Sequence, residues 1–269
     1  MRFWSRVKKI FKRSGVIAVI RLEGVIATGG RLGGGISDQT MAPLIEKAFE
    51  LGRLKAVALV INSPGGSPSQ SSLLASRIIR LSKEKKIPVY AFCEDVAASG
   101  GFWLACSAEE IYADENTIVG SIGVISAGFG FHELIARQGI ERRVYTSGEE
   151  KSMLDPFKPE KEEEIERLRL IQKAIHLNFK DFVSSRRGKK IEGKDIFNGE
   201  IWESNRAKDL GLIDGIGHME PILKKKYGKD IKFKKLDRKR SIFSRVGKAS
   251  VDGVFDAFVE NIYFSRFRL

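Results

Sequence analysis

Short apolar runs alternate with amphipathic segments along the first half of the chain. The apolar runs are rich in Val, Ile and Ala and have the length of buried strands, whereas the segments between them carry apolar positions at helical spacing. The predicted strands are 16–24, 56–62, 89–92 and 111–114, and the predicted helices are 38–52, 69–85 and a short helix after Ser99. This β-α-β-α order predicts an α/β fold with a mostly parallel sheet and right-handed crossovers.

The second half of the chain is more highly charged. Apolar positions recur at helical spacing through 159–185, which predicts one long helix. The RRGKK patch at 186–190 is interpreted as an exposed loop, and RRVYT at 142–146 as a strand. No internal repeat or low-complexity linker divides the chain. We therefore expect a basic N-terminal arm (1–15), one catalytic domain (16–221) and a basic C-terminal extension (222–269).

Basic charge gathers at both ends of the chain. Of the net charge of +13, residues 1–21 contribute +7 and residues 224–248 contribute +10, which leaves −4 for the rest. Helical spacing would place the apolar residues of the first thirteen positions on one face, opposite Arg and Lys: Phe3, Trp4, Val7, Ile10 and Phe11. This pattern is typical of a helix lying on an anionic membrane surface. A solvated arm and a helix docked on a neighbouring subunit are alternatives, and nucleic acid is the least favoured partner.

No apolar run is long enough to cross a bilayer. VIAVI at 16–20 ends at Arg21, whereas a signal-peptide core needs about 7–15 apolar residues and a membrane span about 20. Residues 251–267 have apolar positions at helical spacing, which predicts an amphipathic helix. We expect helical extensions at both ends of the domain, and a location in the cytoplasm or peripherally on a membrane surface.

The two cysteines, Cys93 and Cys106, lie too far apart for a CxxC motif and lack the His or Cys companions of a zinc site. We expect both to be small buried hydrophobic residues. No metal and no cofactor is indicated.

Two glycine turns follow predicted strands. In NSPGG, Pro64 sets a rigid turn, while Gly65 and Gly66 allow close approach of the backbone to a ligand. Backbone N–H groups left free there, next to the helix that follows, can bind an oxyanion. In the second turn, AASGG, Ser99 precedes Gly100. Ser99 is therefore a core hydroxyl, a helix cap or a nucleophile.

A nucleophilic serine needs a general base. The three histidines, His132, His176 and His218, have sequence neighbourhoods that give no sign of a Ser-His-Asp triad. A desolvated lysine can take the same role, because burial favours the neutral amine. Lys151 lies near apolar residues of 153–157, but on residues alone it is one solvated cation among 47.

Five segments taken together resemble peptidase family S49, which includes signal peptide peptidase A and related membrane-associated serine proteases. They are NSPGG, DVAASGGFWLAC, TIVGSIGVI, SGEEKSMLDPF and GEIWESNRAKDLGLIDGIG, and in that order they cover about residues 16–217. The resemblance implies a Clp protease/crotonase-like α/β fold with repeated β-β-α units, and a Ser-Lys dyad.

The resemblance assigns roles to individual residues. Ser99 matches the nucleophile, Lys151 the general base, and Ser121 a second hydroxyl that orients the lysine amine. Gly66 and Gly100 match the backbone donors of the oxyanion hole. In this arrangement neutral Lys151 takes the proton while Ser99 attacks a peptide carbonyl.

The expected function is a serine endopeptidase that cleaves unfolded or hydrophobic peptides, such as remnant signal peptides or membrane-protein fragments. The family forms rings in which neighbouring subunits complete each active site, so a homo-oligomeric ring is expected, with the helix at 159–187 and the C-terminal helix as contacts. Peripheral contact with an anionic membrane is a further expectation, and no nucleic-acid partner is expected. The alternatives are a crotonase-type acyl-CoA enzyme, for which NSPGG would form a thioester oxyanion hole, and a non-catalytic membrane-associated scaffold.

Overall fold

The computed structural model describes residues 14–28 and 35–237, so the predicted N-terminal arm and C-terminal helix lie outside the described residues apart from residues 14 and 15. The strands are β1 (Val16–Glu23), β2 (Leu54–Ser63), β3 (Val89–Ala98), β4 (Glu110–Ala113), β5 (Ile118–Gly120), β6 (Ile201–Glu203), β7 (Gly215–Ile216) and β8 (Lys232–Leu236). The α-helices are α2 (Asp38–Phe49), α3 (Pro68–Lys85), α4 (Gly100–Ala105), α5 (His132–Arg137), α6 (Glu162–Arg187), α7 (Ser204–Asp209) and α8 (Met219–Tyr227), and the 3-10 helices are η1 (Glu149–Ser152) and η2 (Gly188–Ile191).

These strands form one sheet, in which the order β6-β5-β3-β2-β1-β8 is extended by β4 and β7 beside β3. All pairs are parallel except β5 with β6. The predicted α/β class is confirmed, and the strands at 16–24, 56–62, 89–92 and 111–114 are all present. The predicted strand at 142–146 is wrong, because these residues form no regular element and lie on the surface.

The apolar strands are buried on both faces, as parallel strands between layers must be. In β2, Val57, Leu59 and Ile61 face the core under α2, α3 and α4. The alternate residues of β2, together with Leu223 of α8, form a second core on the other face. Successive side chains of a strand point to opposite faces of the sheet, so one continuous apolar run contributes to both cores.

The residues after 221 belong partly to this body. The boundary predicted at 221 falls inside α8, and β8 pairs in parallel with β1 over Val16–Ile20. Residues 222–236 thus complete the sheet instead of forming an extension. No helix among the described ranges 14–28 and 35–237 is long and apolar enough to cross a membrane.

The RRGKK patch is only partly the exposed loop that was expected, because Arg186 and Arg187 end α6 whereas residues 188–190 are exposed in η2. Arg187 is 3% exposed and forms an ion pair with Asp214 (2.9 Å), whose carboxylate also accepts the Ile111 N–H (2.8 Å). Arg186 donates to the carbonyls of Cys106 and Ala108 at 2.8 and 3.0 Å. The end of α6 is therefore fixed to the body by two guanidinium groups.

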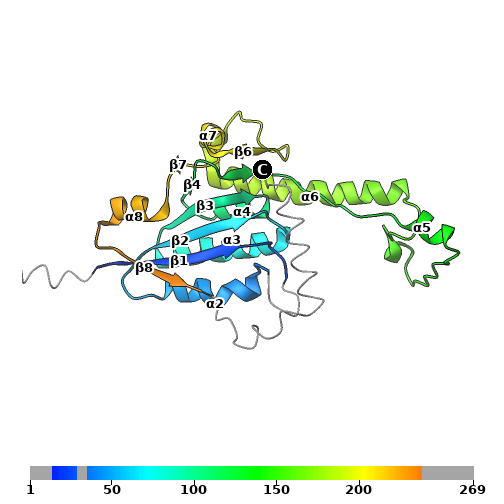
Figure 1. The fold of residues 1–269 in the computed structure, drawn as a ribbon, viewed down its shortest axis with the longest axis horizontal. Coiled ribbons are helices and arrows are strands. Elements are labelled where there is room, and N and C mark those ends of the chain that lie inside the picture. Colours follow the sequence, from blue (N-terminus) through cyan, green and yellow to red (C-terminus); the bar gives the residue numbers. More distant parts are fainter. Residues whose placement is uncertain (1–13, 29–34, 238–269) are drawn as a thin grey trace, which may run out of the picture.

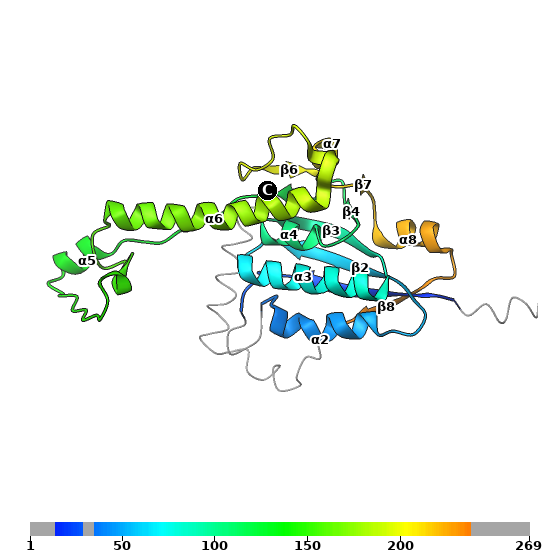
Figure 2. The ribbon, with the colours of Figure 1, turned by 180° about the vertical axis from the view of Figure 1, so that it is seen from behind.

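The first half of α6 extends away from the sheet, as Figures 1 and 2 show. We call this part of α6, together with residues 124–161, the arm. Only the second half of α6 packs on the body, where Phe179 and Phe182 stack on Trp103 of α4 at centroid distances of 4.5 and 5.3 Å. The arm carries several large apolar side chains that are mostly exposed: Ile125, Phe129, Leu134, Ile140 and Tyr145.

Candidate active site

Ser99 occupies a sharp turn between β3 and α4. Its backbone has φ 52° and ψ −121°, a conformation that L-residues rarely adopt and that costs on the order of 1–3 kcal/mol. The Ser99 N–H donates to Gly120 O (2.8 Å), and its carbonyl accepts the Trp103 N–H (3.0 Å). Within the described part of the chain the half-buried hydroxyl has no hydrogen-bond partner and does not cap α4. The geometry presents a free Oγ on a strained elbow, which excludes the helix-cap interpretation.

The PGG turn lies directly against this elbow. A Cβ placed on Gly65 would lie 2.7 Å from both Gly100 N and Ser99 Cβ, so only glycine fits. A Cβ on Gly66, at φ +138°, would lie 2.1 Å from the carbonyl oxygen of Ile26. The two glycine turns that the sequence singled out therefore meet in space.

Two backbone N–H groups are free at this junction. The hydrogen bonds between the PGG turn and Ile26 are Ile26 N–H to Gly65 O (2.8 Å) and Ser67 N–H to Ile26 O (2.7 Å), and they leave the Gly66 N–H unused. The Gly100 N–H belongs to the first turn of α4, where no intrahelical acceptor exists. Neither group donates a hydrogen bond among the described residues. Such a pair can stabilise an oxyanion.

Ser121 lies beside Ser99. β3 and β5 are parallel, and their register pairs Ala98 with Gly120, so the two serines follow paired residues at neighbouring strand ends. Neighbouring strands are about 4.8 Å apart. Ser121 also has a positive φ, 54°, and its N–H donates to Glu200 O (2.6 Å). Strand pairing thus brings together Ser99, Ser121 and the glycine donors.

Lys151 is placed elsewhere. It is exposed and lies in η1, on the arm. Glu150 in the same element forms an ion pair with Arg167 (3.1 Å), which is twelve residues, or about 18 Å of helix, before the Phe179 contact with α4. The structure of one chain therefore does not bring Lys151 to Ser99.

One of the histidines lies near the elbow. His176 of α6 makes a hydrogen bond through Nε2 to the carbonyl of Ile122 (3.1 Å), the residue after Ser121. No local pattern predicts this contact, because the two residues are 54 positions apart. His132 lies in α5 of the arm, and His218 pairs with Asp114 (2.9 Å).

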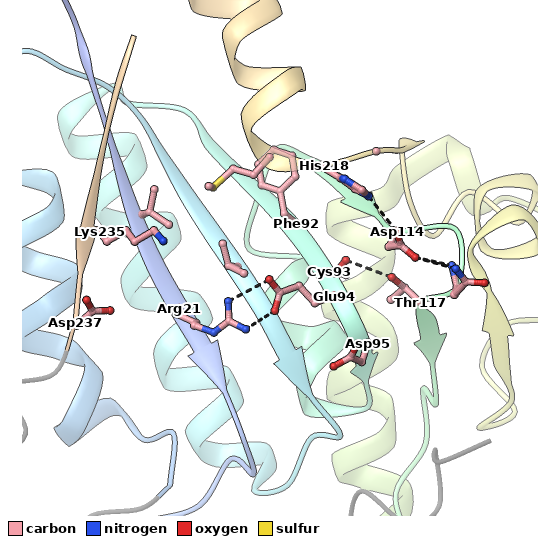
Figure 3. A pocket seen from close by; sticks show the side chains of 15 residues that line it. Arg21, Phe92, Cys93, Glu94, Asp95, Asp114, Thr117, His218, Lys235 and Asp237 are labelled. Carbon is pink, nitrogen blue, oxygen red and sulfur yellow. Dashed lines mark hydrogen bonds and ion pairs between the residues drawn. The ribbon is translucent and has the colours of Figure 1, made fainter.

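The face of the sheet that α8 covers also holds a cavity of about 690 Å³ (Figure 3). Four of its polar side chains form two pairs with one another. Arg21 donates two hydrogen bonds to Glu94, and His218 bonds Asp114 across the cavity rim. Glu94 and Asp95 of β3 line it a few residues before Ser99. The cavity therefore presents a polar wall, in part of paired side chains, on the strand that carries the Ser99 elbow.

The cysteines behave as predicted. Cys93 and Cys106 are buried and unbonded to each other. Burial raises the pKa of the Cys106 thiol to about 12 and raises that of Cys93 further. Both thiols are therefore protonated core groups with no nucleophilic role at neutral pH.

Comparison with known proteins identifies relatives of this chain. The model of peptidase family S49 matches residues 81–230. A putative signal peptide peptidase SppA of Enterococcus faecium is 33% identical over 190 residues, covering 69% of this chain and 54% of that protein. A Brucella abortus protein named Na(+)/H(+) antiporter NhaA is 49% identical over 231 residues, covering 85% of this chain but 31% of that protein.

Two further matches extend the comparison. The chloroplastic serine protease SPPA of Arabidopsis thaliana is 33% identical over 205 residues, covering 74% of this chain and 29% of that protein. The solved structure of a mutant of the 1510-N membrane-bound stomatin-specific protease matches 83% of this chain and 98% of its own, at 16% identity and a TM-score of 0.48.

The chain spans between about a third and a half of the length of the first curated relatives it matches. The family model covers more than half of this chain, and the matched range contains Ser99, Ser121 and Lys151. The resemblance predicted from the motifs is confirmed, and the chain belongs to peptidase family S49.

Proposed function

We propose that the chain is a serine endopeptidase in which Ser99 is the nucleophile and Lys151, supplied by a neighbouring copy, is the general base. The observation that carries this proposal is the strained elbow at Ser99, where the hydroxyl and two nearby N–H groups make no hydrogen bond to any residue that the structure describes. Backbone strain of this kind persists only where the surrounding structure enforces the conformation, and such positions cluster at active sites. A purely structural serine would gain nothing from the conformation.

The reaction follows from these groups. The Ser99 Oγ forms a bond to the peptide carbonyl carbon while its proton passes to the neutral amine of Lys151. The N–H groups of Gly66 and Gly100 stabilise the oxyanion, and the C–N bond then breaks as the leaving amine takes the proton. Water then attacks the acyl carbon while its proton passes to the Lys151 amine, and the C–Oγ bond breaks as Ser99 takes that proton back. Ser121, at the adjacent strand end, orients the amine of Lys151 by a hydrogen bond.

A neighbouring chain has to supply Lys151, because the arm holds this residue away from its own Ser99. The exposed apolar side chains of the arm support such docking, since contiguous apolar surface marks interaction sites. Burial also disfavours the charged form of a lysine, so docking would supply the neutral amine. An arm that reaches the next copy makes a head-to-tail contact, and such a contact forms the proposed ring when the rotation between successive copies closes.

The proposed substrates are unfolded or hydrophobic peptides, such as remnant signal peptides or membrane-protein fragments. Support comes from the names of the Enterococcus and Arabidopsis relatives, which are described as a signal peptide peptidase and a serine protease. The basic ends of the chain support peripheral contact with an anionic membrane. An acyl-CoA enzyme would use the same oxyanion hole but has no use for Lys151, and a scaffold has no use for the strained Ser99.

The decisive experiment labels the purified full chain with a serine-directed acylating inhibitor, followed by intact mass, and in parallel measures cleavage of an unfolded protein. Wild type is compared with Ser99→Ala, Lys151→Ala and His176→Gln. We expect labelling and cleavage in wild type and in His176→Gln, and neither in the first two variants. Loss in His176→Gln with retention in Lys151→Ala would make the imidazole the base. No labelling of the wild-type chain would refute the peptidase proposal.

Co-expression of Ser99→Ala with Lys151→Ala tests where the lysine comes from. If each site takes its serine from one chain and its lysine from the next, random mixing restores about one quarter of wild-type activity. If both residues come from one chain, the mixture stays inactive. Co-expression of Ser99→Ala with Ser121→Ala is the matched control, because both serines lie at one elbow and cannot complement between chains.

A further inference from the structure

Exposed cations gather at the end of the sheet opposite Ser99. Each helix of a parallel β-α-β unit ends where the next strand begins, so the turns after α2, α3 and α8 lie at the amino ends of the strands. Both ribbon views show α8 and the ends of α2 and α3 at this end of the body (Figures 1 and 2). Nine exposed cations in and beside these turns form what we call the basal cationic surface: Lys47, Arg53, Lys55, Lys83, Lys85, Lys86, Lys225, Lys229 and Lys232.

These nine charges are not neutralised by ion pairs among the described residues. The nearby carboxylates Glu46, Glu84 and Glu220 pair with other cations, namely Arg77, Arg80 and Lys224. Glu50 and Asp230 are the other exposed carboxylates of these turns, and Glu109 is an exposed carboxylate in the neighbouring turn between α4 and β4. Nine cations against three carboxylates leave a strongly positive end on a protein whose central region is acidic overall.

The surface is also hollowed. A cavity of about 570 Å³ is lined by Pro221, Lys224, Lys225 and Lys229. Lys224 is held by Glu220 (2.7 Å), whereas Lys225 and Lys229 have no ion pair among the described residues, so their two ammonium groups can donate to the phosphate or carboxylate of an anionic group. The apolar stem of each lysine can lie along the surface. The recess therefore has the chemistry to take an anionic headgroup.

The composition of the residues that precede Gly15 points to lipid. Residues 1–13 precede Gly15 in the sequence, and Gly15 lies at this same end, where its carbonyl accepts the Lys232 N–H (3.1 Å). They carry six cations, no acid, and large apolar residues that include Phe3, Trp4 and Phe11. A nucleic-acid duplex would engage the charges but would leave these apolar side chains without a partner, whereas a bilayer interface accommodates both.

We propose that the basal cationic surface docks the folded body on an anionic membrane surface. In this orientation the strands stand away from the bilayer, and β3 carries Ser99 at its far end. The ten residues of β3 span about 33 Å at 3.3 Å per residue. The nucleophile is then held roughly 30 Å above the lipid headgroups, facing away from them.

The test is co-sedimentation of the full chain with vesicles of phosphatidylcholine plus phosphatidylserine, at low and at physiological ionic strength. The basal variant replaces Lys83, Lys85 and Lys86 by Gln, and the matched control replaces Lys189, Lys194 and Lys208, which are also exposed but lie outside the basal turns. Since each lysine near an anionic surface contributes about fivefold, the basal variant should bind about 100-fold more weakly. The control should bind as wild type, and binding should weaken as salt rises.

Four results would overturn the proposal. They are equal binding of the basal variant and the control, equal binding to pure phosphatidylcholine vesicles, no binding at all, and retention on duplex DNA in preference to vesicles. Ser99→Ala should bind vesicles as wild type does, because the surface does not involve the elbow. Failure of the peptidase proposal therefore leaves this measurement unaffected.

Discussion

Replacing Ser99 by glycine should make the protein more stable while abolishing the proposed peptidase activity. At φ 52° and ψ −121°, Ser99 carries backbone strain on the order of 1–3 kcal/mol, which glycine does not experience. Glycine adds freedom to the unfolded chain, which costs about 0.4–1 kcal/mol. The net gain is about 1 kcal/mol in the free energy of unfolding, or about 2–4 °C in Tm for a domain of this size.

Ser99→Ala separates the two contributions. Alanine keeps the strain and removes only a hydroxyl that has no hydrogen-bond partner among the described residues, so Tm should hardly change. The measurement is differential scanning calorimetry of wild type, Ser99→Ala and Ser99→Gly, with cleavage of an unfolded substrate run alongside. Both variants should be inactive, and glycine should be the more stable.

Ser76 provides the matched control for the glycine effect itself. It is an exposed residue in the interior of α3, where glycine should be about 1 kcal/mol less stable than alanine. The order of the two variants is thus expected to reverse between positions 76 and 99. If glycine lowers the free energy of unfolding relative to alanine at position 99 as much as it does at position 76, the elbow stores no strain. The main argument for a nucleophile at position 99 then fails.

Two further predictions concern the surroundings of the elbow. Gly66→Ala would place a Cβ 2.1 Å from Ile26 O and displace an oxyanion donor, so kcat should fall about 10²–10³-fold in a peptide-cleavage assay, with a loss of stability seen by calorimetry. Asp214→Asn should destabilise the fold by about 3–5 kcal/mol in urea titrations, because it leaves the guanidinium of Arg187 buried and uncompensated. Burial pushes the pKa of Asp214 up, but hydrogen bonds from Arg187 and Lys190 outweigh it and hold that pKa below its ordinary value. The stabilisation is then present above the unfolded-state pKa and is lost as pH falls through the folded one, so the difference between wild type and Asp214→Asn should shrink in acid.

The elements that position Ser99 could be predicted from sequence because they are set by local patterns. The apolar runs at 16–24, 56–62 and 89–92 are consecutive parallel strands, and consecutive strands bring the turns at their carboxyl ends to one edge of the sheet. The PGG turn and the Ser99 elbow therefore had to meet. Ser121 joins them because β5 pairs with the end of β3.

The predictions from sequence were wrong where the structure of a segment depends on residues far away in the chain. RRGKK has the composition of a solvated loop, yet Arg187 is buried because Asp214, 27 positions later, receives it. RRVYT has the composition of a strand, but among the described residues of the arm there is no strand with which it could pair. Lys151 was matched by motif, and a motif fixes neither the distance to Ser99 nor the chain that supplies the amine.

The proposed arm contact and the proposed membrane contact constrain each other. The arm and the basal cationic surface lie at opposite ends of the body, so the two contacts do not compete for the same residues. Cyclic symmetry gives every copy the same tilt, and the basal surfaces share one plane only if the strands run nearly parallel to the ring axis. A ring in that orientation would present many basal surfaces to one bilayer and bind it with avidity. Substitutions that break the arm contact should then weaken vesicle binding although the arm carries none of the basal cations, and unchanged binding of such a variant would mean that the ring and the membrane surface are not coupled in this way.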